Sequence, residues 1–194
     1  MPLAERVRLT LEQIGRFSDR QGGLYQTEFG GIVGYRLSDA VEIGFGYRKL
    51  GTHNGNSGAS EDRLRQHIVA SFGPVVTRLR VDERFHPGGD EIGFRIRPLV
   101  RYTHPLARSD VAVFVSHESF FLPNSTRWGQ RSGLERMRNV IGVALPLSGT
   151  VSADVGYLNQ YRFSPQGARP QMDHALSVQL TINVAGRSSP HVDD

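Results

Sequence analysis

The 194-residue chain contains no cysteine, a single tryptophan and no long apolar run. The absence of cysteine excludes disulfide bonds, thiolate metal sites and a thiol nucleophile. No stretch approaches the roughly 18 consecutive apolar residues that a membrane-spanning helix needs. Hydrophobic residues make up only 38% of the chain. That share is typical of a soluble protein, but it also fits membrane strands, because each such strand turns only half of its residues toward lipid.

The start of the chain also lacks an apolar core of the length found in secretory signal peptides. A protein of the bacterial outer membrane is synthesised with such a peptide, so we expect this chain to be a processed form if it resides there. Residues 2–5 (PLAE) resemble the later turn sequences at 105–108 (PLAR) and 146–149 (PLSG). We therefore expect further strands upstream of residue 1.

Alternation of apolar and polar residues is the dominant pattern of the chain. In residues 41–48 and 176–183, every second residue is apolar and its neighbours are polar or glycine. A period of two indicates β-strands with one face in an apolar environment. Ten segments with strand character follow one another: about 6–17, 24–36, 41–50, 63–72, 77–85, 92–104, 111–121, 134–145, 151–163 and 172–184.

The connections between these segments differ in length. The stretches 37–40, 73–76, 105–110 and 146–149 are short, whereas 51–62, 122–133 and 164–171 are long. Outer-membrane barrels combine short periplasmic turns with longer external loops in this way. We predict an all-β, antiparallel, up-and-down transmembrane β-barrel of about ten strands. It would form a single domain over residues 1–194, with the barrel at about 3–184 and a polar tail at 185–194.

The polar face of the predicted strands carries charges of both signs, which would point into the barrel. We expect them to form a network of ion pairs in the lumen. Its predicted members are Arg78, Arg80, Asp82, Arg95, Arg97, Arg101, Glu118, Arg136, Arg138 and Asp154. The arginines could line an anion pathway, or they could pair with the carboxylates and fill the interior. We favour the filled interior, because small barrels are mostly occupied by their own side chains.

The net charge of +4 raises the question of nucleic-acid binding. The arginines are spread singly along the strands and alternate with apolar residues, whereas a nucleic-acid groove would cluster them with stacking aromatic side chains. We expect no nucleic-acid partner.

Metal and cofactor chemistry find little support in the sequence. The histidines outside residues 116–121 are scattered, without the close spacing that zinc sites show. The glycine-rich stretch 51–58 lacks the Lys-Ser/Thr pair of a phosphate-binding loop. We expect neither a metal ion nor a cofactor.

Three motifs in the second half of the chain are specific. Residues 116–121 read SHESFF, residues 128–139 read WGQRSGLERMRN, and residues 156–161 read GYLNQY. Together they resemble domain-of-unknown-function family 2490 (DUF2490) of predicted bacterial outer-membrane barrels. That family combines a Glu before two aromatics, a Trp-Gly-x-Arg-Ser-Gly loop and a Gly-Tyr-x-x-Gln-Tyr strand.

The resemblance implies a location in the outer membrane of a Gram-negative bacterium. It also implies contact with outer-membrane lipid and lipopolysaccharide, and insertion by the barrel-assembly machinery. It implies no activity, because none is established for the family, and it leaves the oligomeric state open.

One constellation hints at catalysis. His117 and Ser119 project from the same face of a strand and could act as base and nucleophile. A His-x-Ser pair facing lipid resembles the arrangement in outer-membrane lipid A deacylases. Glu118 points to the opposite face, so Glu135 is the candidate for the orienting carboxylate. Alternatively, His117 and Ser119 are interfacial residues without a catalytic role.

The leading prediction for function is a non-enzymatic outer-membrane barrel with a structural role, a surface-interaction role or a narrow, porin-like pathway. The first alternative is a hydrolase of lipid A or phospholipid that uses His117 and Ser119. The second alternative is a soluble ligand-binding β-barrel, because alternation alone does not say which face lies inside.

Overall fold

The computed structural model describes residues 6–54, 60–163 and 169–184. The sequence at 2–5, from which we expect strands upstream, and the predicted tail at 185–194 lie outside the described residues. Parts of two predicted long loops, 55–59 and 164–168, also lie outside them.

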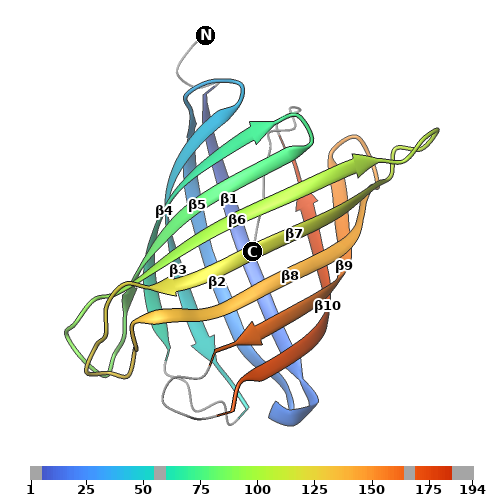
Figure 1. The fold of residues 1–194 in the computed structure, drawn as a ribbon. Coiled ribbons are helices and arrows are strands. Elements are labelled where there is room, and N and C mark those ends of the chain that lie inside the picture. The colour runs from blue at the N-terminus through green and yellow to red at the C-terminus, as the bar shows by residue number, and fades with distance from the viewer. Residues whose placement is uncertain (1–5, 55–59, 164–168, 185–194) are drawn as a thin grey trace. The chain divides into compact units, whose positions relative to one another are not determined.

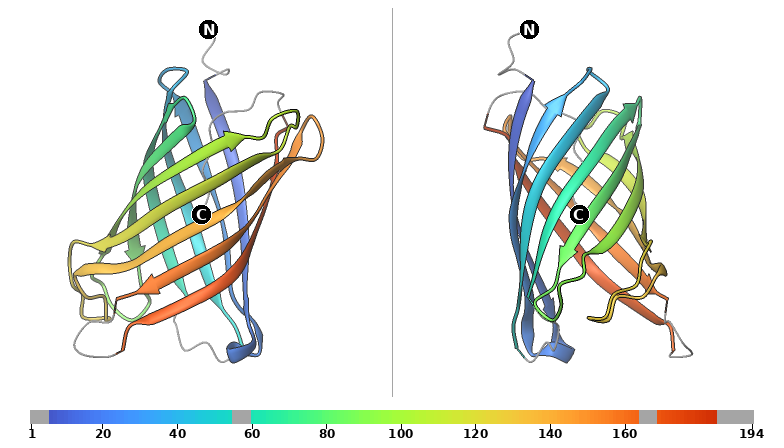
Figure 2. Two further views of the ribbon diagram at one scale, coloured as in Figure 1. Left: turned by 45° about the vertical axis from the view of Figure 1, so that its right-hand side comes forward. Right: turned by 90° about the vertical axis from the view of Figure 1, so that its left-hand side faces the viewer.

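Ten strands form one antiparallel sheet in which consecutive strands are neighbours, in the order β1 to β10 (Figures 1 and 2). This confirms the predicted all-β, up-and-down arrangement. A short 3-10 turn, η2 (Asp19–Gln21), joins the first two strands. The strands are β1 (Val7–Ser18), β2 (Gly23–Arg36), β3 (Val41–Thr52), β4 (Glu61–Phe72), β5 (Val75–Phe85), β6 (Gly93–Pro105), β7 (Ala112–Leu122), β8 (Gly133–Pro146), β9 (Val151–Arg162) and β10 (Gln171–Ile182). Within the described ranges, no helix is long and apolar enough to cross a membrane.

The strand register places buried residues opposite buried residues and exposed residues opposite exposed residues. Gly30 on β2 lies opposite Arg48 on β3, and Ile141 on β8 lies opposite Tyr157 on β9. The ladder between β1 and β2 shifts register between Arg16 and Phe17, which marks a bulge near the turn. Because side chains alternate along each strand, this register fixes which residues share a face.

The chain divides into two compact units, and the strands β4 to β8 each contribute residues to both. Unit 1 consists of residues 1–68, 80–96 and 122–133, and unit 2 of residues 69–79, 97–121 and 134–194.

In unit 1, many apolar side chains of the strands are exposed and many charged side chains are buried. Leu11 on β1 is 72% exposed, whereas Arg48 on β3 is 2% exposed. Phe29 and Phe45 are also exposed, and Glu28 is buried. This is the reverse of a water-soluble core, in which buried charges are rare.

Unit 2 shows the same inversion. Leu176 on β10 is 76% exposed, whereas Glu118 on β7 is 3% exposed. Val115 and Val178 are exposed, and Arg97 is buried. In both units, we call the exposed, apolar side of the strands the outward face and the buried, charged side the inward face.

Candidate functional site

A buried ion-pair cluster occupies the inward face of unit 1 at β1, β2 and β3. The guanidinium of Arg48 donates to Glu12 at 2.7 Å and to Glu28 at 2.8 Å. Glu12 also pairs with Arg65 of β4, and Glu28 pairs with Arg16 at 3.0 Å. Each carboxylate therefore meets two guanidinium groups, and shared charge-assisted bonds of this kind compensate the cost of burial.

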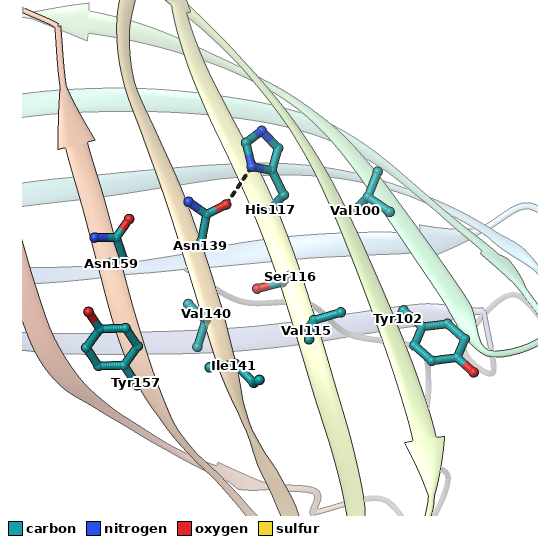
Figure 3. Close-up of a pocket in the computed structure, with 10 residues that line it drawn as sticks. All are labelled: Val100, Tyr102, Val115, Ser116, His117, Asn139, Val140, Ile141, Tyr157 and Asn159. Atoms are coloured by element: carbon teal, nitrogen blue, oxygen red, sulfur yellow. Dashed lines mark hydrogen bonds between the residues drawn. The ribbon is translucent and has the colours of Figure 1, made fainter.

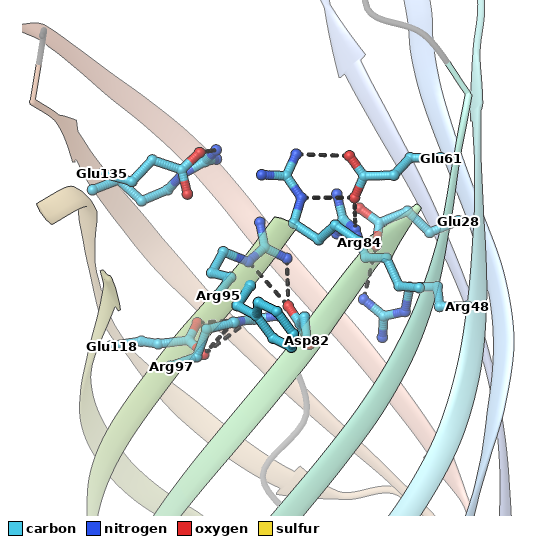
Figure 4. A network of polar contacts seen from close by, with 12 residues as sticks. Glu28, Arg48, Glu61, Asp82, Arg84, Arg95, Arg97, Glu118 and Glu135 are labelled. Carbon is cyan, nitrogen blue, oxygen red and sulfur yellow. Dashed lines mark hydrogen bonds and ion pairs between the residues drawn. The ribbon is translucent and has the colours of Figure 1, made fainter. Parts of the chain in front are cut away.

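A second cluster of unit 1 involves β4, β5 and β6 (Figure 4). Glu61 accepts hydrogen bonds from Nε and Nη2 of Arg84, at 2.8 and 2.6 Å, and it also pairs with Arg63. Asp82, which is 0% exposed, accepts hydrogen bonds from Nε and Nη2 of Arg95, at 3.0 and 2.5 Å. Two-pronged Arg–carboxylate contacts fix the orientation of both partners.

The inward face of unit 2 is organised around Glu118 of β7. Its carboxylate accepts hydrogen bonds from Arg78 at 2.7 Å and from two nitrogens of Arg97 at 3.0 Å each. Nη1 of Arg138 on β8 lies 3.8 Å from Oε2 of Glu118. The guanidinium groups of Arg97 and Arg138 also lie 4.6 and 5.1 Å from the ring centroid of Phe120, which adds cation–π attraction.

Further pairs of unit 2 are less deeply buried. Arg101 of β6 donates to Asp154 of β9 at 2.5 Å and lies over the ring of Phe114, 3.8 Å from its centroid. Arg136 donates to its neighbour Glu135 at 2.5 Å.

The predicted lumen residues thus separate by burial. Arg101, Arg136 and Asp154 are half-buried. The others are buried on the inward face of their own unit: Arg78, Arg80, Asp82, Arg95, Arg97, Glu118 and Arg138. Sequence reasoning omitted Glu61 from the network, because it placed this residue in a loop. Strand β4 begins at Glu61, two residues earlier than predicted, and the alternation of Glu61, Arg63 and Arg65 was the available signal.

The outward face of unit 2 carries a polar trio among apolar neighbours. Nδ1 of His117 lies 2.7 Å from Oδ1 of Asn139, and Nε2 lies 3.0 Å from Oγ of Ser119. An amide oxygen only accepts, so the neutral tautomer that satisfies both contacts has its proton on Nδ1 and its lone pair on Nε2, toward the Ser119 hydroxyl. The three side chains therefore have the geometry of a base between an orienting group and a hydroxyl.

Two members of the trio, His117 and Asn139, line a mostly apolar groove of about 400 Å³ on the outward face of β6 to β9 (Figure 3), and Ser119 adjoins it through its contact with His117. In Figure 3, His117 and Asn139 point toward each other across two neighbouring strands. The groove is lined by Val100, Tyr102, Val115, Ser116, His117, Asn139, Val140, Ile141, Tyr157 and Asn159.

Asn139 occupies the place at His117 that the sequence prediction gave to Glu135. Glu135 lies four residues before Asn139 on β8, which corresponds to roughly 13 Å along a strand, and its carboxylate bonds Arg136. Sequence reasoning missed Asn139 because no motif marks it. The signal that could have found it is a polar residue in the outward series Met137, Asn139 and Ile141.

In unit 1, the 122–133 segment is bonded to the end of the β5–β6 connection. Nε1 of Trp128 donates to the carbonyl of Glu91 at 2.7 Å, and the Trp128 ring stacks on His86 with centroids 4.8 Å apart. The buried Gln130 donates to the carbonyls of Phe94 and Asn124 and accepts a bond from Arg84. These contacts give the segment a defined conformation.

Among the residues that the structure describes, no three His, Asp or Glu side chains gather closely enough to hold a metal ion.

Ten consecutive antiparallel strands with a buried, ion-paired face define an all-β, up-and-down class of protein. The sequence profile of the family described as "Protein of unknown function (DUF2490)" matches residues 1–171. The chain belongs to this family, as the motifs predicted. It is also similar to "Uncharacterized protein MexAM1_META1p0181" of Methylorubrum extorquens. The two are 33% identical over 158 residues, which cover 77% of this chain and 69% of the relative.

Proposed function

We propose that this protein is an integral β-barrel of the bacterial outer membrane, in which the strands close around a charged interior. Its role is structural or lies in surface interaction, and its partners are outer-membrane lipid and lipopolysaccharide. The observation that carries the proposal is the inverted burial of both units: apolar side chains on the outward face and paired charges on the inward face. Such a protein exposes its apolar face to lipid and satisfies its polar groups internally.

The extent of the apolar outward face supports the membrane proposal. Large hydrophobic side chains are exposed along successive strands, such as Leu9 and Leu11 on β1 and Leu176, Val178 and Leu180 on β10. Soluble proteins rarely expose more than a few hundred Å² of contiguous apolar surface. A ligand-binding barrel in water would turn these side chains inward, so the membrane proposal is favoured over the soluble alternative.

The inward face supports a filled interior rather than a wide pore. Arg65 and Arg80 are each only 1% exposed, although the arginines of a water-filled channel would be hydrated. Carboxylates shared between arginines, such as Glu12 and Glu118, neutralise much of this charge. Side chains that pack and pair in this way leave little room for a solute.

Membrane insertion is tested with lipid vesicles. Purified chain is refolded with preformed phospholipid vesicles, floated on a density gradient, and then analysed by gel electrophoresis with and without boiling. We expect the protein to float with the vesicles after a carbonate wash and to migrate faster when it is not boiled. The proposal would be contradicted if the protein stayed at the bottom of the gradient and was a soluble monomer in the absence of detergent.

The filled interior is tested by planar-bilayer recording. We expect no steady single-channel conductance from the wild-type protein. A steady conductance whose ion preference changes in Arg95→Ala or Arg97→Ala would show an open pathway and overturn the filled interior, while leaving membrane insertion intact.

A further inference from the structure

We infer that His117, Ser119 and Asn139 form a hydrolytic triad that cleaves carboxylic esters of fatty acyl chains bound in the adjacent groove. The inference rests on the proposed function only for the source of the substrate, which is the surrounding lipid. The chemistry rests on the geometry of the trio.

The hydrogen bonds place each group in the state that nucleophilic catalysis requires. Nδ1 of His117 lies 2.7 Å from Oδ1 of Asn139, a contact that favours the tautomer with the proton on Nδ1. In that tautomer, Nε2 accepts a hydrogen bond from the Ser119 hydroxyl, and the distance from Nε2 to Oγ is 3.0 Å. This distance is within the range expected for a base and its nucleophile. Asn139 is a positioning residue, because it acts through the imidazole, as the asparagine does in Cys-His-Asn sites.

The reaction needs only an ester and water. Oγ of Ser119 attacks the ester carbonyl carbon while its proton moves to Nε2 of His117. The bond from the acyl carbon to the alcohol oxygen then breaks, and the alcohol leaves with that proton. Water attacks the acyl-serine in the same way, with Nε2 taking its proton. The fatty acid is released and the proton returns to Ser119.

The groove indicates the class of substrate. Its lining beside His117 includes Val100, Val115 and Ile141, all of which are exposed on the outward face. An acyl chain lying against these side chains would place its carboxyl end near the polar trio. The polar side chains of the trio would act on the ester group. The apolar side chains of the groove would bind the hydrocarbon chain, which favours long acyl chains over short ones.

The trio lies among apolar side chains and pairs its own polar groups. Its neighbours on the outward face of β7 are Val113, Val115 and Phe121. Polar side chains exposed to hydrocarbon cost free energy unless they are paired, so mutual hydrogen bonding alone would make the trio tolerable. Hydrolysis must therefore be tested directly.

Reactivity of Ser119 is measured with a fluorescent fluorophosphonate on protein refolded in detergent micelles. We expect one label per chain, at Ser119, and no label in Ser119→Ala or His117→Ala. The matched controls are Ser177→Ala and His174→Ala, which we expect to be labelled like the wild type. Ser177 lies on the inward face of β10, and His174 is an outward histidine that contacts the Tyr157 hydroxyl rather than a serine.

Hydrolysis is measured with p-nitrophenyl esters of increasing chain length in the same micelles. We expect kcat/KM to rise with chain length, and to fall roughly 10²- to 10⁴-fold in Ser119→Ala and His117→Ala. Asn139→Leu should lower kcat with little change in KM, and Asn139→Asp should restore much of the rate because it retains an acceptor for Nδ1–H. A purely structural role of Asn139 would not give this rescue.

Absence of labelling and of hydrolysis, in protein that shows folded migration on unboiled gels, would overturn the inference. A rate that survives in Ser119→Ala would do the same. Neither result concerns vesicle flotation, which tests the proposed membrane location, so the two proposals fail independently.

Discussion

Arg97 and Glu118 form a two-pronged ion pair, with Nε of the arginine 3.0 Å from Oε1 and Nη2 3.0 Å from Oε2. Both side chains are 3% exposed. The same carboxylate also accepts a bond from Arg78. Glu118 therefore compensates more than one buried positive charge, and removing it leaves those charges without their shared anion.

Neutralising Glu118 should destabilise the protein strongly. Glu118→Gln keeps the size of the side chain but removes the charge, and breaking a buried pair from one side costs about 3–5 kcal/mol. The free energy of unfolding is measured by urea titration in lipid vesicles, followed by the fluorescence of Trp128, the single tryptophan. The control is Asp62→Asn at the exposed pair with Lys49, which should change stability far less. Equal effects of the two substitutions would refute the role of Glu118.

A methyl group at Gly142 should also be destabilising. A Cβ there would lie 2.4 Å from the carbonyl oxygen of Val155 and 2.7 Å from Cα of Gly156 on the paired strand. The backbone of β9 is held by its pairing with β8 and cannot move aside without breaking that pairing. We therefore expect Gly142→Ala to lower the free energy of unfolding by about 1–3 kcal/mol, as overpacking does. Gly149→Ala in the turn of the same hairpin is the control, because a Cβ there meets nothing within 4 Å. The prediction fails if both variants unfold at the same urea concentration.

Replacing Gln130 should loosen the 122–133 segment without unfolding the sheet. Gln130→Ala removes the bonds to the carbonyls of Phe94 and Asn124 and leaves Arg84 without its amide partner. Trypsin can then reach Arg127, whose side chain is already exposed, and we expect cleavage there to accelerate roughly tenfold, as a local opening of about 1.4 kcal/mol would produce. Gln21→Ala, at an exposed glutamine of η2, is the control. Unchanged cleavage in Gln130→Ala would show that these bonds do not hold the segment.

The strands could be predicted from the sequence because burial on one face imposes a period of two on the residues. Pairings across several strands could not be predicted, because they depend on register and on the reach of long side chains. The contact of Arg65 with Glu12, for example, joins β4 to β1. Asn139 was missed for a similar reason: its role depends on lying beside His117 on the neighbouring strand. Motif reasoning instead selected a carboxylate, Glu135, whose position along β8 is wrong for this contact.

The most direct test of the account is a spin-label scan along β10 in lipid vesicles. The chain has no cysteine, so single-cysteine variants at residues 176–181 each carry one label, whose collisions with oxygen and with a water-soluble nickel complex are measured. The outward positions Leu176, Val178 and Leu180 should collide mostly with oxygen, which concentrates in hydrocarbon. Collisions with oxygen should be fewer at Ser177, Gln179 and Thr181, giving a period of two. Outward positions that collide mainly with the nickel complex would contradict the lipid-facing barrel.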